Sequence, residues 1–364
     1  MLTKWETFVL LFMTIPIMSH VVILPLLIDV VGRDAWISVL LSLPAALIFA
    51  LVIYKLRLQF PTMNITEILV QLLGKWLGKG VQLIMMLYFM FLTILSFACL
   101  VDLIYIAFLP STPRAFTLVW FWAFVVYAAS KGIKRIALTA CLLALISAVI
   151  GPFISFMATF LKHWAQLKPL VEYGWNPVLL GTLILVSVWM ELLLLLCIPI
   201  ENIHVKRLYI FWVVGISINA ILMLSTATGA ITIFGLRQAD NFVYPALEII
   251  RLINLGIIDR VDVYALIVMT FGSYIRCSLY LRLAFDVGVK NTASKLIKRS
   301  TFALLAVIAL VGSYFIAKEH FRVDRGIIAY TYMIVLYPLP FLLLGISLFK
   351  RKKADTSEEY PVQQ

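Results

Sequence analysis

The chain has 364 residues, of which 63% are hydrophobic and only 13% are charged. Soluble domains are usually about half apolar and about a quarter charged, so this composition excludes an ordinary soluble protein and predicts an all-α integral membrane protein. The formal net charge of +12 at pH 7 could indicate a nucleic-acid partner. The basic residues lie in short segments between apolar runs, however, so we interpret the charge as membrane orientation and expect no nucleic acid to bind.

Ten apolar runs are long enough to cross a bilayer as helices, and they are continuous rather than alternating, which argues against a β-barrel. The predicted spans are 8–30, 35–54, 80–109, 114–130, 136–161, 178–200, 208–235, 263–287, 301–317 and 327–349. We expect them to form a single transmembrane bundle over residues 1–349. A basic and then polar tail, 350–364, follows; we expect it to be unstructured and to hold anionic lipid headgroups through its basic cluster.

The distribution of Lys and Arg between alternate connecting segments predicts the orientation of the bundle. With the N-terminus in the cytoplasm, 18 of these residues fall in inside segments and 10 in outside segments. Cytoplasmic segments of membrane proteins carry an excess of Lys and Arg. An even number of spans then places both termini in the cytoplasm.

The first predicted span carries Pro16 and Pro25 on either side of the pair Ser19-His20. Proline removes a backbone donor and clashes with the preceding turn of a helix. This pattern indicates either a helix that opens locally around the polar pair or an ordinary proline kink, which membrane helices tolerate.

Two connecting segments are predicted to be helical. The segment 60–80 is typical of a partly amphipathic cytoplasmic helix ended by glycine. The segment 242–261 predicts a short outer helix that begins at Pro245 and closes at Gly256. Its apolar residues Leu247, Ile250 and Leu255 would face the bundle, so this helix is either a lid or a structural cap.

Glu191 lies near the centre of the sixth predicted span. A carboxylate at this depth costs roughly 2.5–3.5 kcal/mol on insertion scales. Glu191 therefore either serves packing only, protonated or hydrogen-bonded to a neighbouring helix, or lines a polar cavity where a ligand or protons are handled.

Three more polar residues lie at a similar depth on other spans. His20, Glu191 and Arg276 are each about 12 or 13 residues into their spans, a depth of roughly 18–20 Å at 1.5 Å per residue. Ser96 is midway along the third span. The four side chains are predicted to share one layer of the bundle.

Helical spacing adds further residues to this layer. Ser273, Arg276 and Tyr280 form one face of the eighth span, and Ser187 is four residues before Glu191. A carboxylate ligand would suit Arg276 and an ammonium group would suit Glu191, so the layer suits a small amino acid. The alternative is that Glu191 and Arg276 form a structural ion pair, which neutralises both charges.

No catalytic or metal-binding motif is present, so we expect neither enzyme activity nor a cofactor. The histidines are too scattered for a metal site, and the cysteines lie inside apolar spans, as is typical of buried, reduced thiols. These residues are His20, His163, His204 and His320, and Cys99, Cys141, Cys197 and Cys277.

Several short stretches, in this order and spacing, resemble the endospore germination permease family over almost the whole chain. They are Pro25 with Asp34-Ala35-Trp36; Phe60-Pro61 with Leu73-Gly74-Lys75-Trp76-Leu77-Gly78; Leu167-Lys168-Pro169 with Gly174 and Pro177; Met190-Glu191; Tyr244-Pro245; and Asp259-Arg260. That family looks like a branch of the amino acid–polyamine–organocation superfamily.

The resemblance implies a LeuT-like fold of two inverted five-helix repeats, spans one to five and six to ten. The first helix of each repeat is then interrupted, and the ligand lies between these two helices. Ser19 and His20 on span one and Ser187 and Glu191 on span six would line the site, with Ser96 and Tyr280 beside them. The chain departs from the family at Met18-Ser19-His20, which has no glycine, and span six has no central Gly or Pro.

The resemblance also implies a function. The chain would be the permease-like B subunit of a nutrient germinant receptor, a multi-pass protein in the inner membrane of a bacterial spore. It would bind a small germinant, such as an amino acid, and signal to a larger A subunit and a lipoprotein C subunit. The alternatives are a proton-coupled amino acid permease and a structural or ion-conducting subunit that binds no nutrient.

Overall fold

A computed structural model describes residues 1–200, 207–254, 256, 260–289, 293–318 and 334–358. The described part is almost entirely helical, and its only β-type pairing is an isolated bridge between Leu2 and Ile200. Three predictions fall partly outside these residues: the start of the tenth span (327–333), Leu255, and the end of the tail (359–364). The all-α class predicted from composition is confirmed.

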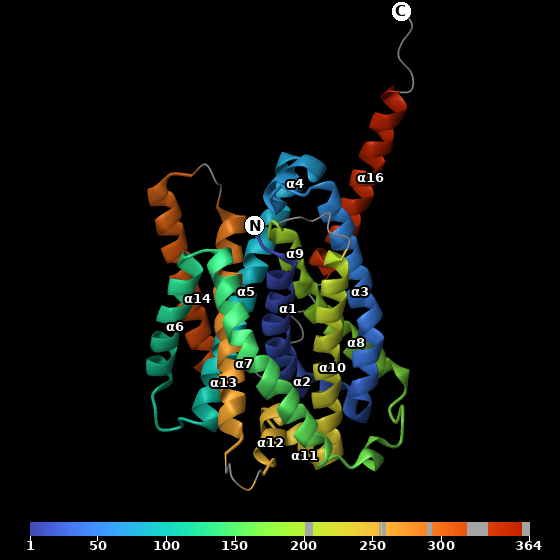
Figure 1. The fold of residues 1–364 in the computed structure, drawn as a ribbon, viewed down its shortest axis with the longest axis vertical. Helices are drawn as coiled ribbons and strands as arrows, with labels where there is room; N and C mark the ends of the chain where they lie inside the picture. The colour runs from blue at the N-terminus through green and yellow to red at the C-terminus, as the bar shows by residue number, and fades with distance from the viewer. Residues whose placement is uncertain (201–206, 255, 257–259, 290–292, 319–333, 359–364) are drawn as a thin grey trace, which may run out of the picture.

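The helices follow one another with short connections (Figure 1). In chain order they are α1 Lys4–Ile17, α2 Leu24–Val31, α3 Ala35–Gln59, α4 Ile65–Leu73, α5 Lys75–Ala107, α6 Arg114–Ser130, α7 Ile133–Thr159, α8 Trp175–Trp189, α9 Leu194–Cys197, α10 Leu208–Phe234, α11 Leu236–Asn241, α12 Pro245–Arg251, α13 Asp262–Gly288, α14 Lys295–Lys318 and α16 Leu339–Glu358. A π-helix, η1 Met18–Ile23, and short 3-10 helices, η2 Gly32–Asp34, η3 Trp164–Leu167 and η4 Met190–Leu193, lie between them.

Seven helical runs within the described residues are long and apolar enough to cross a membrane, and two shorter apolar helices accompany them. The first run, Lys4–Gln59, has 56 residues. As one straight helix it would be about 84 Å long, far more than the ~30 Å hydrocarbon core. The chain instead turns at Gly32, whose φ of 70° favours glycine, and α3 runs back beside the bundle (Figure 1).

The predicted connecting helices are present as α4, which ends at Leu73 and is capped by Gly74, and α12, which begins at Pro245. The predicted end of the outer helix at Gly256 is wrong, because α12 already ends at Arg251. Leu247 and Ile250 of α12 are buried, as expected for a helix that faces the bundle. The prediction of an unstructured tail is wrong up to Glu358, because α16 continues through the basic cluster.

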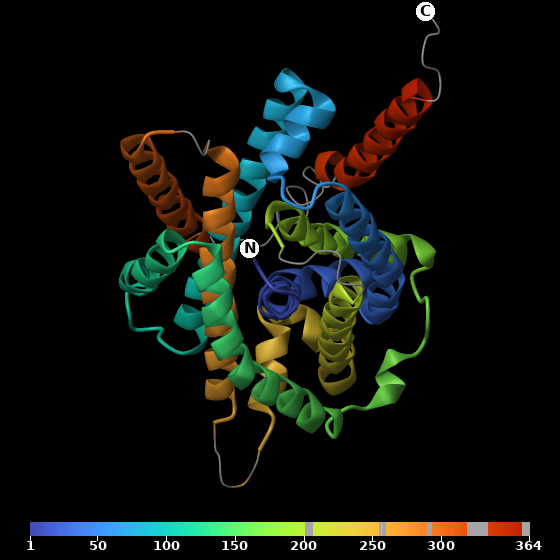
Figure 2. The same ribbon diagram turned by 45° about the horizontal axis from the view of Figure 1, so that its top comes forward.

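Helix α1 lies near the middle of the bundle, with α13 and α7 on one side and α10 and α3 on the other (Figure 2). One continuous cluster of buried apolar side chains surrounds it. Glycine allows two close approaches to this central segment, as is usual between membrane helices. Gly272 of α13 packs against Ile17 and the Met13 carbonyl, and Gly181 of α8 packs against α2 and α3.

Replacing Gly181 with alanine is expected to destabilise the fold by about 1–3 kcal/mol, as overpacking does. A β-carbon there would collide with Val31 Cγ2 and lie 2.7 Å from Ser38 Oγ. The matched control is Gly345→Ala in α16, where a β-carbon meets no atom within 4 Å. Thermal unfolding of both variants in the same detergent checks this; equal midpoints would show that α8 moves aside without penalty.

Candidate functional site

Glu191 lies in the 3-10 turn η4, which joins α8 to α9 near the centre of the bundle. Its side chain is only 1% exposed. Four consecutive residues, Met190–Leu193, adopt the tighter 3-10 geometry although no Gly or Pro interrupts this stretch. The carboxylate therefore projects from an irregularity in the helix, and such irregularities often mark functional positions or strained sequence.

Arg276 of α13 binds the Glu191 carboxylate through both ends of its guanidinium group. Nη1 donates to Oε2 at 2.5 Å and Nη2 donates to Oε1 at 2.6 Å. Tyr280, one helical turn further along α13, donates its hydroxyl to Oε2 at 2.7 Å. All three side chains are buried, so this is a two-pronged, charge-assisted interaction inside the bundle.

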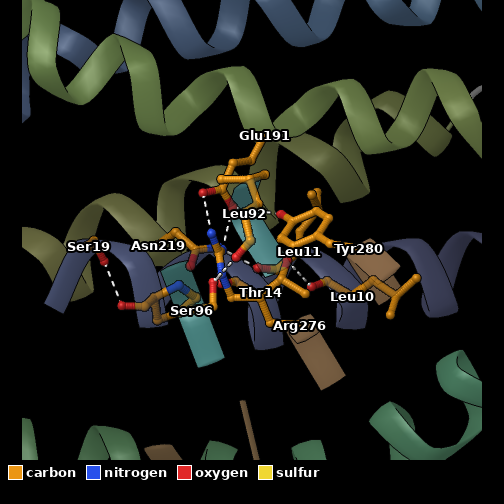
Figure 3. A network of polar contacts seen from close by, with 11 residues as sticks. Leu10, Leu11, Thr14, Ser19, Leu92, Ser96, Glu191, Asn219, Arg276 and Tyr280 are labelled. Atoms are coloured by element: carbon orange, nitrogen blue, oxygen red, sulfur yellow. Dashed lines mark hydrogen bonds and ion pairs between the residues drawn. The ribbon is translucent and has the colours of Figure 1, made fainter. Parts of the chain in front are cut away.

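The remaining donors of Arg276 tie the pair to two other helices (Figure 3). Nε donates to Ser96 Oγ on α5 at 2.6 Å, and Nη1 also donates to the Thr14 carbonyl of α1 at 2.8 Å. Ser96 in turn donates to the Leu92 carbonyl. We call Ser96, Glu191, Arg276 and Tyr280 the Glu191 cluster; together with the Thr14 carbonyl it connects α1, α5, η4 and α13.

The Thr14 carbonyl can accept this bond because the α-helix is interrupted just after it. In a regular helix the N–H of Met18 would donate to Thr14, but here it donates to the Ile15 carbonyl. The π-helix η1 then begins, after Pro16. Of the two interpretations of span one, the structure therefore has a local widening, not an extended opening and not a simple kink.

Glu191 and Arg276 form an ion pair near the middle of the bundle. Each charge alone would cost roughly 2.5–3.5 kcal/mol there on insertion scales. Pairing removes the net charge, and the three added hydrogen bonds satisfy the other polar atoms, which buried pairs need. Phe89 covers the cluster on one side, with its ring stacked 5.8 Å from that of Tyr280. The structural ion pair foreseen as an alternative is thus present.

The space beside the Glu191 cluster is small. A cavity of about 20 Å³ is lined by residues of η1, α5 and the α8–η4 segment, including Met18, Tyr88, Ser187 and Glu191. One water needs roughly 10–15 Å³ by the same measure. In this conformation the cavity has room for a water molecule but not for an amino acid.

The eight residues predicted to form one site are divided by the structure. Four make up the Glu191 cluster. Ser19 and Ser187 instead donate to carbonyls of their own helices, those of Pro16 and Ile184. Ser273 is buried in α13, and His20 contacts Thr226 of α10, with 3.0 Å between Nδ1 and Oγ1. The common depth of His20 and Glu191 therefore does not bring these two side chains into one hydrogen-bonded group.

Several buried polar groups were missed by the sequence reasoning, among them Tyr88 and Arg57. Tyr88 lines the small cavity beside Glu191. Arg57 was counted among the loop residues, yet it is completely buried and donates to carbonyls of the segment that follows η4. The only available signal was its place in the last turn of a long helix, which is common for loop-facing arginines as well.

Metal-ligand side chains do not gather in the described part of the chain: no three of His, Cys, Asp and Glu come together there. His204, His320 and Asp259 lie outside the described residues. All four cysteines are described as free thiols, and three of them are buried.

The chain is similar to known spore germination proteins. A family model described as spore germination protein matches residues 1–322, which include the whole Glu191 cluster. Spore germination protein XB of Bacillus anthracis is 29% identical over 274 residues, 74% of this chain and 76% of the relative. Spore germination proteins YndE and KB of Bacillus subtilis (strain 168) are 25% and 23% identical over 331 and 340 residues, which are 88% and 90% of each chain.

Proposed function

The chain belongs to the family of spore germination proteins, and we propose that it is the permease-like B subunit of a nutrient germinant receptor. It binds a small germinant, most simply an amino acid, within the bundle and triggers germination through partner subunits. The observation that carries this proposal is the buried Glu191–Arg276 pair, which offers one partner for each charged end of an amino acid.

The proposed architecture has ten transmembrane helices in one bundle over residues 1–349, arranged as a LeuT-like pair of inverted five-helix repeats. The tail 350–364 and both termini are on the cytoplasmic side. The apolar helices support a multi-pass membrane protein, which we place in the spore inner membrane. Support for the repeats comes from two interrupted helices, α1–η1–α2 and α8–η4–α9, that pack against each other.

The proposed binding reaction is an exchange of partners. The carboxylate of the germinant takes the place of Glu191 on Arg276, and Glu191 then faces the ammonium group of the germinant. Opening of η1 and η4 provides the space that the closed conformation lacks. The proposed ligand site comprises Ser19, Ser96, Ser187, Glu191, Ser273, Arg276 and Tyr280. Of the eight residues predicted from the sequence, His20 is left out of it because its ring contacts Thr226 of α10 instead.

The signal in this scheme is a shift between two conformations. A ligand can shift such an equilibrium only through its different affinity for the two states. The Arg276 bond to the Thr14 carbonyl links α13 to α1, so an exchange at Arg276 changes how these helices are held. The rearranged bundle signals to a larger A subunit and a lipoprotein C subunit.

Tyr280→Phe is expected to lower the germinant concentration for half-maximal germination by about three- to tenfold. The hydrogen bond from the Tyr280 hydroxyl to the Glu191 carboxylate stabilises the closed state, and the substitution removes it. The ring that stacks on Phe89 is kept. The matched control is Tyr209→Phe, whose hydroxyl bonds the Leu47 carbonyl. Dose–response curves of spores with equal receptor levels check this. Identical shifts in both variants would show that the Glu191 cluster does not control the germinant response.

A thermal-shift screen of amino acids on the purified chain tests ligand binding directly, and uptake into proteoliposomes tests the alternative of a proton-coupled permease. Saturable stabilisation without uptake is expected. Ligand-dependent uptake by this chain alone would establish the permease. If no amino acid stabilises the wild-type chain while Tyr280→Phe still alters germination, the Glu191 cluster governs assembly or conductance instead.

A further inference from the structure

A second, larger cavity lies one helical turn away from the Glu191 cluster. Its volume is about 140 Å³, and its walls come from α1 and η1, α7, α10, α12 and α13. We call it the α12 cavity, because Ala246, Ile249 and Ile250 of that short helix form part of its wall. In Figure 1 α12 lies across the ends of the surrounding helices, beside α7 and α10.

Among the described residues, the walls of the α12 cavity are mainly apolar and include no Asp, Glu, Lys or Arg. Lys162 contacts the lining residue Ser225, but its Nζ is already bound to the Ser225 carbonyl and Thr228 Oγ1. A zwitterion inside would leave two charges without partners, which is very costly in an apolar site. The α12 cavity is therefore suited to an uncharged molecule.

One polar feature projects into this apolar space. The hydroxyl of Thr226 lies within hydrogen-bond distance of the Leu222 and Met223 carbonyls, at 3.1 and 3.0 Å, and of His20 Nδ1 at 3.0 Å. Because the carbonyls can only accept, we assign the hydroxyl proton to them and the ring proton to Nδ1 of His20. Nε2 is then a hydrogen-bond acceptor. Of the described residues that line the cavity, His20 is the one with a titratable side chain, and it is only half-buried although it lies within the bundle.

The volume of the α12 cavity also limits the size of the molecule that can bind there. An engineered apolar cavity of about 150 Å³ in another protein stays dry and binds benzene. The α12 cavity has nearly this volume, so it accommodates a six-membered ring. Because Nε2 of His20 is assigned as an acceptor and His20 lines the cavity, a ring that carries one hydrogen-bond donor is favoured over a bare ring.

We propose that the α12 cavity is a second binding site, for an uncharged, ring-sized apolar molecule with one hydrogen-bond donor that is received by His20 Nε2. The cavity shares its wall with the Glu191 cluster, since Met13 precedes Thr14 and Gly272 is one turn before Arg276. An occupant would contact the same α1–α13 junction that Arg276 bridges.

The test uses the full chain in nanodiscs of deuterated lipid, with phenol, benzene and alanine as probes. The ring-nitrogen NMR signals of histidine are followed, and His20 is assigned by its loss in His20→Gln. Phenol is expected to shift the Nε2 signal saturably, benzene to compete more weakly, and alanine to have no effect. Contacts of His20 with lipid chains that phenol does not displace would identify a lipid site and overturn the proposal, as would a shift with alanine.

Variants separate cavity binding from partition into the lipid. Ala158→Leu fills the cavity from α7 and is expected to weaken phenol binding at least tenfold. Ala246→Leu fills it from α12, is expected to have the same effect, and is used if Ala158→Leu fails to fold. Ala123→Leu, on the exposed side of α6, is the matched control and is expected to change binding less than twofold. Thr226→Val is expected to weaken phenol about three- to tenfold but not benzene. Unchanged phenol binding in the filled variants would overturn the proposal.

Discussion

Arg276→Gln is expected to lower the free energy of unfolding by about 3–5 kcal/mol, the usual effect of removing one partner of a buried ion pair. The substitution leaves the Glu191 carboxylate buried with only the Tyr280 hydroxyl as a strong donor, and it removes the bond to the Thr14 carbonyl. Unfolding of the purified chain in one detergent, and the amount of protein in spores, measure the effect.

The matched control for this substitution lies on the same helix. Arg282 pairs with Asp286 at 2.8 Å, but the two side chains are 24% and 34% exposed. A pair at this exposure is worth at most about 1 kcal/mol, so Arg282→Gln is expected to be nearly neutral. Equal losses for Arg276→Gln and Arg282→Gln would mean that the buried pair adds nothing to the fold.

A double substitution separates structure from ligand recognition. Glu191→Gln together with Arg276→Gln removes both charges, so we expect it to recover at least half of the stability lost in Arg276→Gln. Under the proposed function it still lacks a germinant response at normal protein level. Recovery of the response together with stability would show that the pair is purely structural.

The position of the apolar helices was accessible from the sequence because hydropathy is a local property. The predicted span 208–235 is α10, Leu208–Phe234, and the predicted span 263–287 is α13, Asp262–Gly288. The start of α5 at Lys75 was missed, since Lys75–Gly80 carries lysines and glycines that are typical of a connection. Tertiary packing of α5 against α4 overrides this local signal.

The Glu191 cluster was predicted in part, because depth and helical face can both be counted. The estimated depth predicted that Ser96, Glu191 and Arg276 share one layer of the bundle. The helical spacing from Arg276 predicted that Tyr280 lies on the same face of α13. Depth contains no information about rotation around the helix axis, so it did not distinguish His20, which faces Thr226 on α10. The sequence indicated a local opening or a kink after Pro16, but it did not reveal toward which helix the π-helix η1 turns His20.

Arg57, in the last turn of α3, is a second residue whose burial could not be predicted from its position along the helix. It is 0% exposed, and its guanidinium donates to the Ile198 carbonyl at 2.5 Å, the Met63 carbonyl at 2.8 Å and the Leu195 carbonyl at 3.4 Å. Ile198 is where α9 ends and the chain becomes extended. Carbonyls at a helix C-terminus have no partner within the helix and favour a nearby cation.

Arg57→Met is therefore expected to lower the free energy of unfolding by about 3–5 kcal/mol, since buried carbonyls without donors cost about 1–3 kcal/mol each. Arg57→Lys keeps the charge but cannot reach three carbonyls in different directions, so an intermediate loss is expected. The matched control is Arg135→Met, at an exposed position of α7. Chemical unfolding of the three variants checks the order. If Arg57→Met unfolds like Arg135→Met, the end of α9 is held by packing alone.

In spores, Arg57→Met is expected to lower the amount of receptor protein but to leave the germinant dose–response of the remaining receptors unchanged. This would separate the clamp at the end of α9 from the Glu191 cluster, where stability and response should change together.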